Sequence, residues 1–166
     1  MAGFCRDHKL KLLKLYMMMG LPGETSDDID ELGRFSLELA AVAPKLALSI
    51  APFVAKRNTP LDGSPFESIA IIDAKLAQLR ARVKGRVDIR LTSPKWAWIE
   101  YRLAQGGFAA GRAAAPATRA GGRFGDWKAA LADVPAPQVR SHSAAPPELY
   151  GLQTSLRLKD RQLPML

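Results

Sequence analysis

The chain has 166 residues, of which 48% are hydrophobic and 24% are charged, values typical of a soluble globular domain. No apolar run approaches the length of a membrane-spanning helix, which is about 20 residues. The N-terminus also lacks the apolar core of a secretory signal, so we expect a cytoplasmic protein without a membrane span.

The cysteine and histidine content argues against a metal site within this chain. The single cysteine, Cys5, excludes an intrachain disulfide and cannot supply a cluster of thiolate ligands. It lies in a terminal segment that we expect to be frayed, which makes it a poor candidate for a nucleophile. The two histidines, His8 and His142, lack ligand spacing. We therefore predict no catalytic residue and no metal ligand.

The net charge of +8 is carried by the second part of the chain. Residues 1–63 hold 8 basic and 8 acidic side chains, whereas residues 64–166 hold 16 basic and 8 acidic ones. Such asymmetry is compatible with a nucleic-acid surface, but these basic residues stand singly among alanines and glycines. A solvated basic surface is the simpler interpretation, and nucleic-acid binding stays open as an alternative.

The first predicted element is a strand over residues 12–19. Its nearly continuous apolar run indicates burial on both faces of a parallel sheet. Gly20, Pro22 and Gly23 then form a tight exit turn, and Thr25 and Ser26 are N-cap candidates for the helix that follows. In α/β sheets and α/β barrels, ligands bind at this strand-to-helix edge.

The next elements alternate between helices and strands. Apolar residues three and four positions apart mark the helices, and Pro52 indicates the end of the second strand. In chain order the predictions are helix 27–42, strand 45–54, helix 66–84, strand 87–91 and a helix that opens at Ser93–Pro94 and stops at Gly106. This order predicts the α/β class with parallel βαβ units. Three strands are too few to close an eight-stranded barrel.

The sequence signal weakens beyond residue 107. Residues 108–122 are rich in alanine, but we expect Pro116 to block one continuous helix there. Phe124, Trp127 and Leu131 predict a last short helix. From residue 135 onward the chain is rich in proline and has no stable period, so we expect a disordered tail. The predicted division is therefore 1–106, a helical extension over 107–134, and a tail over 135–166.

Four blocks of this sequence resemble, in the right order, the C-terminal part of the barrel of radical S-adenosylmethionine enzymes, in the branch that also carries a cobalamin-binding domain. The resemblance covers about residues 10–130. The blocks are LKLYMMMGLPGET at 13–25, SIAPFVAKRNTPLDG at 49–63, GRVDIRLTSPKWAWIEYRLAQGGFAAG at 85–111 and AGGRFGDW at 120–127. The resemblance implies a partial (β/α) TIM-type barrel of about three parallel strands, followed by a helical extension.

The resemblance also implies a set of residues that support the adenine end of S-adenosylmethionine. By position in the motifs these are Met18, Gly20, Gly23, Glu24, Pro52, Phe53 and Val54. A small residue such as Gly20 suits a strand edge that a flat ligand approaches. Glu24 suits holding the loop and the helix start better than performing chemistry. On the residues alone, a buried strand with a necessary turn explains the same pattern.

One departure from the family is decisive for activity. The family holds a [4Fe–4S] cluster with a CxxxCxxC loop, and this sequence has no such motif. We therefore expect a truncated or split protein whose partner chain supplies the cluster-binding half, with cobalamin carried by an upstream domain. No cofactor is expected to be held by this chain alone. The alternative is a non-catalytic basic module that binds RNA or a protein partner through its second part.

Overall fold

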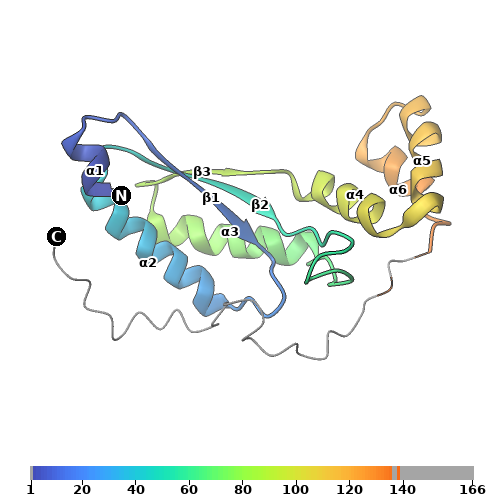
Figure 1. Cartoon of the computed structure of the whole chain (residues 1–166), viewed down its shortest axis with the longest axis horizontal. Coiled ribbons are helices and arrows are strands. Elements are labelled where there is room, and N and C mark those ends of the chain that lie inside the picture. Colours follow the sequence, from blue (N-terminus) through green and yellow to red (C-terminus); the bar gives the residue numbers. More distant parts are fainter. Residues whose placement is uncertain (1, 136–137, 139–166) are drawn as a thin grey trace.

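The computed structural model describes residues 2–135 and residue 138. These residues form a mixed α/β structure with a three-stranded parallel sheet, whose strand order β1-β2-β3 follows the chain (Figure 1). The elements are α1 (Ala2–Asp7), β1 (Leu13–Met19), α2 (Ser26–Val42), β2 (Leu46–Pro52), α3 (Ile69–Val83), β3 (Asp88–Leu91), α4 (Pro94–Gln105), α5 (Gly107–Arg119) and α6 (Phe124–Ala130). Within the described part of the chain, no helix is both long and apolar enough to span a membrane.

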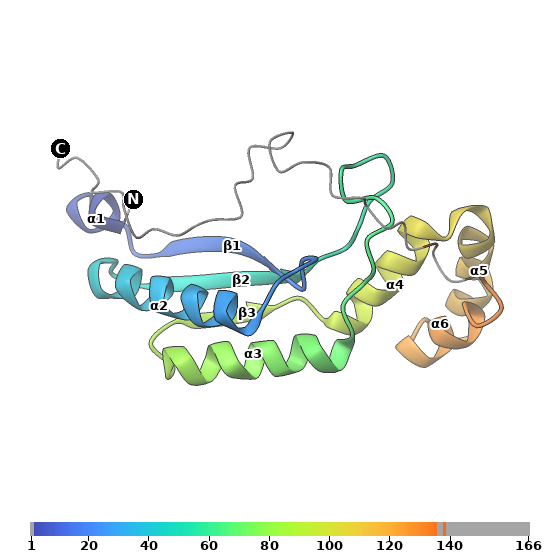
Figure 2. The ribbon, with the colours of Figure 1, turned by 90° about the horizontal axis from the view of Figure 1, so that it is seen from below.

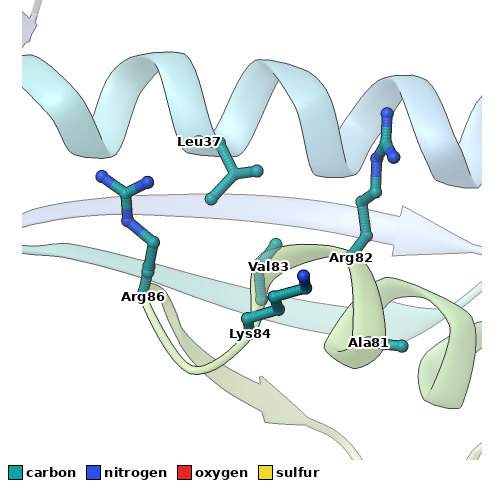
Figure 3. A pocket seen from close by; sticks show the side chains of 6 residues that line it. All are labelled: Leu37, Ala81, Arg82, Val83, Lys84 and Arg86. Atoms are coloured by element: carbon teal, nitrogen blue, oxygen red, sulfur yellow. The ribbon is translucent and has the colours of Figure 1, made fainter.

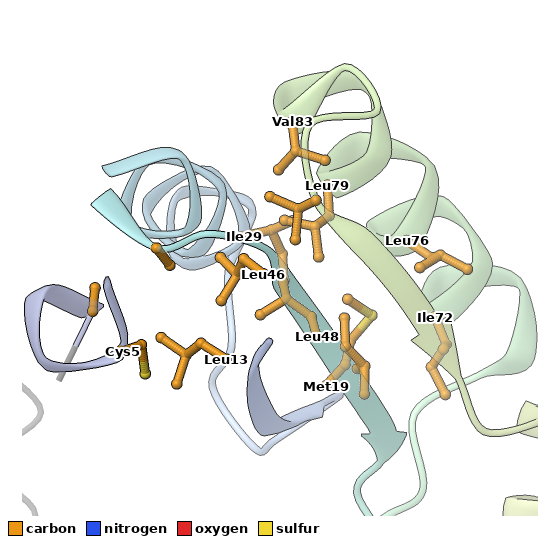
Figure 4. Packing of buried hydrophobic residues seen from close by; sticks show 14 residues of the cluster. Cys5, Leu13, Met19, Ile29, Leu46, Leu48, Ile72, Leu76, Leu79 and Val83 are labelled. Carbon is orange, nitrogen blue, oxygen red and sulfur yellow. The ribbon is translucent and has the colours of Figure 1, made fainter. Parts of the chain in front are cut away.

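The two crossover helices, α2 and α3, cover one face of the sheet (Figure 2). The parallel register places Leu13 beside Leu46 and Leu15 beside Leu48, so these side chains share a face. They belong to the same hydrophobic cluster as Ile72 and other apolar residues of the two helices (Figure 4). This sandwich of one sheet layer and one helix layer is the main core.

The opposite face of the sheet is open in the described structure. Lys14, Tyr16 and Met18 of β1 lie on this face. Tyr16 is 76% exposed and Met18 is 54% exposed. The prediction that this strand is buried on both faces is therefore wrong. Apolar continuity indicates two-sided burial only when helices cover both faces, and here both helices lie on the same one.

The N-terminus is more ordered than the sequence predicts. Residues Ala2–Asp7 form α1, and Cys5 is only 4% exposed because it packs in the main core with Leu13 (Figure 4). The expectation of a frayed terminus around Cys5 is wrong, since the apolar side of this short helix covers the amino end of β1.

Most predicted element boundaries agree with the structure to within a few residues. The largest difference is at α3, which begins at Ile69 with Ser68 as its N-cap rather than at Phe66. Phe66 instead packs against Tyr101 of α4, with ring centroids 5.6 Å apart. The second strand ends at Pro52 as predicted.

Helix α5 runs without interruption through Pro116, so the predicted break is wrong. Proline removes one backbone donor, but the alanine-rich sequence favours the helix and its buried Ala110, Ala113 and Ala117 form a packing face. Ala110 and Ala113 of this face make a small separate core with Leu131, beside Trp98 and Leu103 of α4. The predicted short helix around Phe124 and Trp127 is present as α6. The predicted disordered tail lies almost entirely outside the described residues.

Candidate functional site

The loop after β1 begins with a tight turn at the carboxyl edge of the sheet. Glu24 N donates to Leu21 O at 3.0 Å, and Gly23 between them has a φ of 81°. Pro22 at the second position and glycine at the third are the residues that a type II turn requires. The sequence therefore dictates this turn locally, and it delivers the chain directly into α2.

The side chain of Glu24 ties this loop to both neighbouring elements. Its Oε2 accepts a hydrogen bond from Gly20 N at 2.7 Å and another from Lys75 Nζ at 2.9 Å. Lys75 Nζ also donates to the backbone oxygen of Glu24 at 3.2 Å and to Glu67 Oε2 at 3.4 Å. The loop-holding role expected for Glu24 thus has a direct geometric basis in the ion pair with α3.

This ion pair is largely removed from water. The side chains of Lys75 and Glu24 are 10% and 9% exposed. Burial by itself lowers the pKa of Lys75, but the hydrogen bond and the charge of Glu24, followed by those of Glu67, outweigh it and raise the pKa above its usual range. Lys75 is therefore held as a cation, which makes it a positioning group rather than a proton carrier at neutral pH.

Gly20 is required at its position for two reasons. Its φ of 84° lies in the left-handed region, and a Cβ there would lie 3.0 Å from the Cβ of Glu67. From the sequence, the small size of Gly20 suits the approach of a ligand. In the structure, the neighbour on that side is Glu67.

The loop after β2 is fixed by α4. Phe53 N donates to Met19 O at 2.8 Å, which joins the ends of the first two strands. Phe53 is buried against Tyr101, and burial raises the pKa of the Tyr101 phenol. The amide of Gln105 donates from Nε2 to Ala55 O at 2.9 Å. The carboxyl edge is therefore a rigid, internally bonded rim.

The structure brings the predicted cofactor-binding residues together at this edge. The first group, Met18 to Glu24, and the second group, Pro52 to Val54, adjoin because Met18 pairs with Ala51 and Met19 with Pro52. Met18 is the member that presents an exposed side chain on the open sheet face. The N–H groups of Gly20 and Phe53 already donate within the chain, so they are not available to a ligand.

Sequence reasoning missed the two residues that complete this cluster, Glu67 and Lys75. Lys75 is charged, and lysine is rarely buried without a partner, so the sequence does not mark it as part of the buried stripe of its helix. Lys75 lies three residues after Ile72 and four residues before Leu79, which is the spacing of that stripe, and this was the available signal. A lysine within an apolar stripe indicates a buried acidic partner.

The described residues do not fit an iron–sulfur cluster. Cys5 packs at the amino end of β1, and the seven residues of that strand separate it from the carboxyl edge by about 20 Å. No group of three or more metal-ligating side chains occurs in the part of the chain that the structure describes.

Comparison with protein-family models, with curated proteins and with solved structures finds no match to this chain.

Proposed function

We propose that this chain contributes the S-adenosylmethionine-supporting edge of a radical S-adenosylmethionine enzyme, as the C-terminal part of its (β/α) barrel. The observation that carries the proposal is the position of both crossover helices on one face of a sheet whose strands follow chain order. A (β/α) barrel has this arrangement because its helices form an outer ring around the sheet. Doubly wound sheets instead carry helices on both faces.

In this proposal, the open face of the sheet lines the interior of the barrel. Near its carboxyl end, Met18 lies beside Ala51, a small residue that leaves room above the strands. The exposed thioether of Met18 suits the face of an adenine ring, since methionine packs well against flat aromatic groups. The Glu24–Lys75 pair holds the adjoining loop and has no direct part in the chemistry.

A reduced [4Fe–4S] cluster would supply the radical chemistry with S-adenosylmethionine in such an enzyme, and this chain lacks the cysteines that would hold it. The proposal therefore requires a partner chain with a CxxxCxxC loop, and it predicts no activity for the chain alone. The substrate is unassigned. Cobalamin, if used, belongs to an upstream domain, and the free thiol of Cys5 suits the cytoplasm.

The test begins with the DNA immediately upstream of the codon for Met1, where we expect a reading frame that encodes CxxxCxxC. The two chains are co-expressed, reconstituted anaerobically with iron and sulfide, and assayed for cleavage of S-adenosylmethionine. Cleavage should require both chains and should fall at least tenfold in Met18→Glu, which places a charge on the open face. Phe108→Glu, at a site that is 91% exposed on α5, is the matched control and should keep activity.

Absence of cleavage in the reconstituted pair would contradict the proposal, as would equal loss in both variants. The alternative, a basic module that binds RNA, draws on the exposed Arg80, Arg82 and Lys84 at the end of α3. It requires RNA affinity that falls steeply with salt and with substitution of these residues.

A further inference from the structure

A second feature lies far from the carboxyl edge, between α2 and the end of α3. It is a cavity of about 330 Å³ lined by Leu37 of α2 and by Ala81, Arg82, Val83, Lys84 and Arg86 (Figure 3). Arg82 and Arg86 stand on opposite sides of the hollow, with Lys84 between them. Its floor is apolar and its rim is basic.

The backbone explains why three cations from one short segment meet here. Lys84 adopts a left-handed conformation at the helix C-cap, and Gly85 follows with a φ of 74°. These two residues reverse the chain, and Arg86 N then donates to Val83 O at 2.9 Å. As a result Arg86, which follows α3, lines the same cavity as Arg82, which lies within α3.

The side chain of Arg82 also packs against Gly33 of α2. A Cβ on Gly33 would lie 2.4 Å from Cγ of Arg82, so the stem of this arginine crosses α2 at the one position where a side chain is absent. The aliphatic stem of Arg82 is therefore packed against α2, whereas its charged end is exposed.

The three cations have no internal partner within the described part of the chain. Among the described residues, no ion pair or side-chain hydrogen bond engages Arg82, Lys84 or Arg86. In contrast, Arg34 on the neighbouring helix binds both Glu31 and Glu38. The cavity rim therefore keeps three positive charges available to an external anion.

The dipole of α3 does not account for this arrangement. Basic residues in a last helical turn complement the negative end of the dipole, and this explains Arg80 and Arg82. It does not explain Arg86, which follows the helix. The carbonyls of Arg80 and Val83 at this end already accept hydrogen bonds from Lys84 N and Arg86 N.

We propose that this cavity binds the phosphate or pyrophosphate group of a small phosphorylated molecule. Arginine suits phosphate oxygens because its planar fork donates two parallel hydrogen bonds, and the volume falls at the lower end of the range for small-molecule sites. The apolar floor of Leu37 and Val83 receives the carbon skeleton. None of the described residues that line the cavity is aromatic, and single-stranded RNA recognition depends on aromatic stacking. The site is independent of the function proposed above.

The experiment uses the full chain at low micromolar concentration and radiolabelled pyrophosphate in equilibrium dialysis. We expect saturable binding of one pyrophosphate per chain. Arg82→Gln and Arg86→Gln should each weaken binding about tenfold, because each removes a charge-assisted contact. Arg80→Gln is the matched control, since this exposed arginine shares the helix end but does not line the cavity, and it should change affinity less than about twofold.

A second measurement on the unaltered chain avoids any effect of substitution on folding. Pyrophosphate should protect Lys84 from acetylation but should leave the exposed Lys128 of α6 as reactive as before. The proposal is overturned by a Kd weaker than about 10 mM or by equal weakening in Arg80→Gln. It is equally overturned if a short oligouridylate binds more tightly than pyrophosphate and displaces it, since the surface would then be an RNA site.

Discussion

Lys75 is the residue on which the loop after β1 depends most. It is a buried cation that bonds the side chain and the backbone of Glu24 and also reaches Glu67. Lys75→Met should lower the free energy of unfolding by about 3 kcal/mol, because it leaves the Glu24 carboxylate buried without its charge partner. Urea unfolding followed by circular dichroism measures this loss.

The control for that loss is the double variant Glu24→Gln with Lys75→Met. Removing both charges should restore at least about 1 kcal/mol relative to Lys75→Met alone. Arg80→Met, at an exposed position of the same helix, should stay within about 0.5 kcal/mol of the parent. A single Lys75 variant as stable as the Arg80 variant would show that the ion pair contributes little.

The same ion pair predicts a dependence on alkaline pH. The pKa of Lys75 is raised in the folded state above its usual value of 10.5, with Glu24 as the main favourable partner against burial. Stability from this group is therefore fully present below pH 10.5 and is lost as the pH rises through the folded pKa. Thermal melts between pH 9 and 12 should show a steeper loss in the parent than in Lys75→Met.

Gly20 adopts a left-handed backbone conformation that favours glycine over other residues. Gly20→Ala should destabilise the fold by about 1–2 kcal/mol, because alanine is strained at a φ of 84° and its Cβ meets Glu67. Gly125→Ala in α6 is the matched control, since a Cβ there meets nothing within 4 Å and alanine favours a helix. Equal midpoints for the two variants in urea unfolding would contradict the strain argument.

At the scale of elements, α2 depends on its N-terminal capping box. Thr25 Oγ1 accepts a hydrogen bond from Asp28 N at 3.4 Å, and Asp28 Oδ2 accepts one from Thr25 N at 2.7 Å. Thr25→Ala should cost about 1 kcal/mol of unfolding free energy, whereas Thr25→Ser keeps the acceptor and should cost much less. Urea unfolding distinguishes the two, and equal losses would mean that the hydroxyl is not the capping group.

The capping box also predicts how the stability of α2 depends on acidic pH. The backbone and side-chain hydrogen bonds of Thr25 lower the pKa of Asp28 below its usual value of 3.8. The contribution of this carboxylate is therefore present above pH 3.8 and is lost as the pH falls through the folded pKa. In Asp28→Asn the unfolding free energy should fall less steeply with pH over the same acidic range than in the parent.

At the scale of the whole molecule, the open sheet face governs behaviour in solution. Tyr16 and Met18 are exposed there, and β1 and β3 are both edge strands. We expect the chain alone to self-associate or to lack a cooperative melt, because apolar sheet faces and free strand edges pair with other chains.

Tyr16→Glu combined with Met18→Glu should shift the chain toward monomer in sedimentation velocity, since charges on this face oppose stacking. Phe108→Glu removes an apolar side chain that is even more exposed but lies outside the sheet, and it should not shift the chain toward monomer. A parent chain that is monomeric and melts sharply would contradict the expectation. The soluble double variant is also the suitable background for the unfolding measurements described above.

The sequence by itself determined the local features of this protein. The Pro22–Gly23 turn, the start of α2 near Thr25 and the end of β2 at Pro52 follow from backbone preferences that need no distant partner. The alternation of strands and helices likewise predicted the α/β class, since each period is a local property.

Only the tertiary structure decided which charges and which faces are buried. The sequence could not show that Lys75 meets Glu24 across 51 positions, or that both helices cover one side of β1 and leave Tyr16 exposed. It also could not bring Arg82 and Arg86 around Leu37 of another helix. These outcomes depend on contacts between elements distant in the chain, and burial and electrostatic pairing are properties of those contacts rather than of any local sequence period.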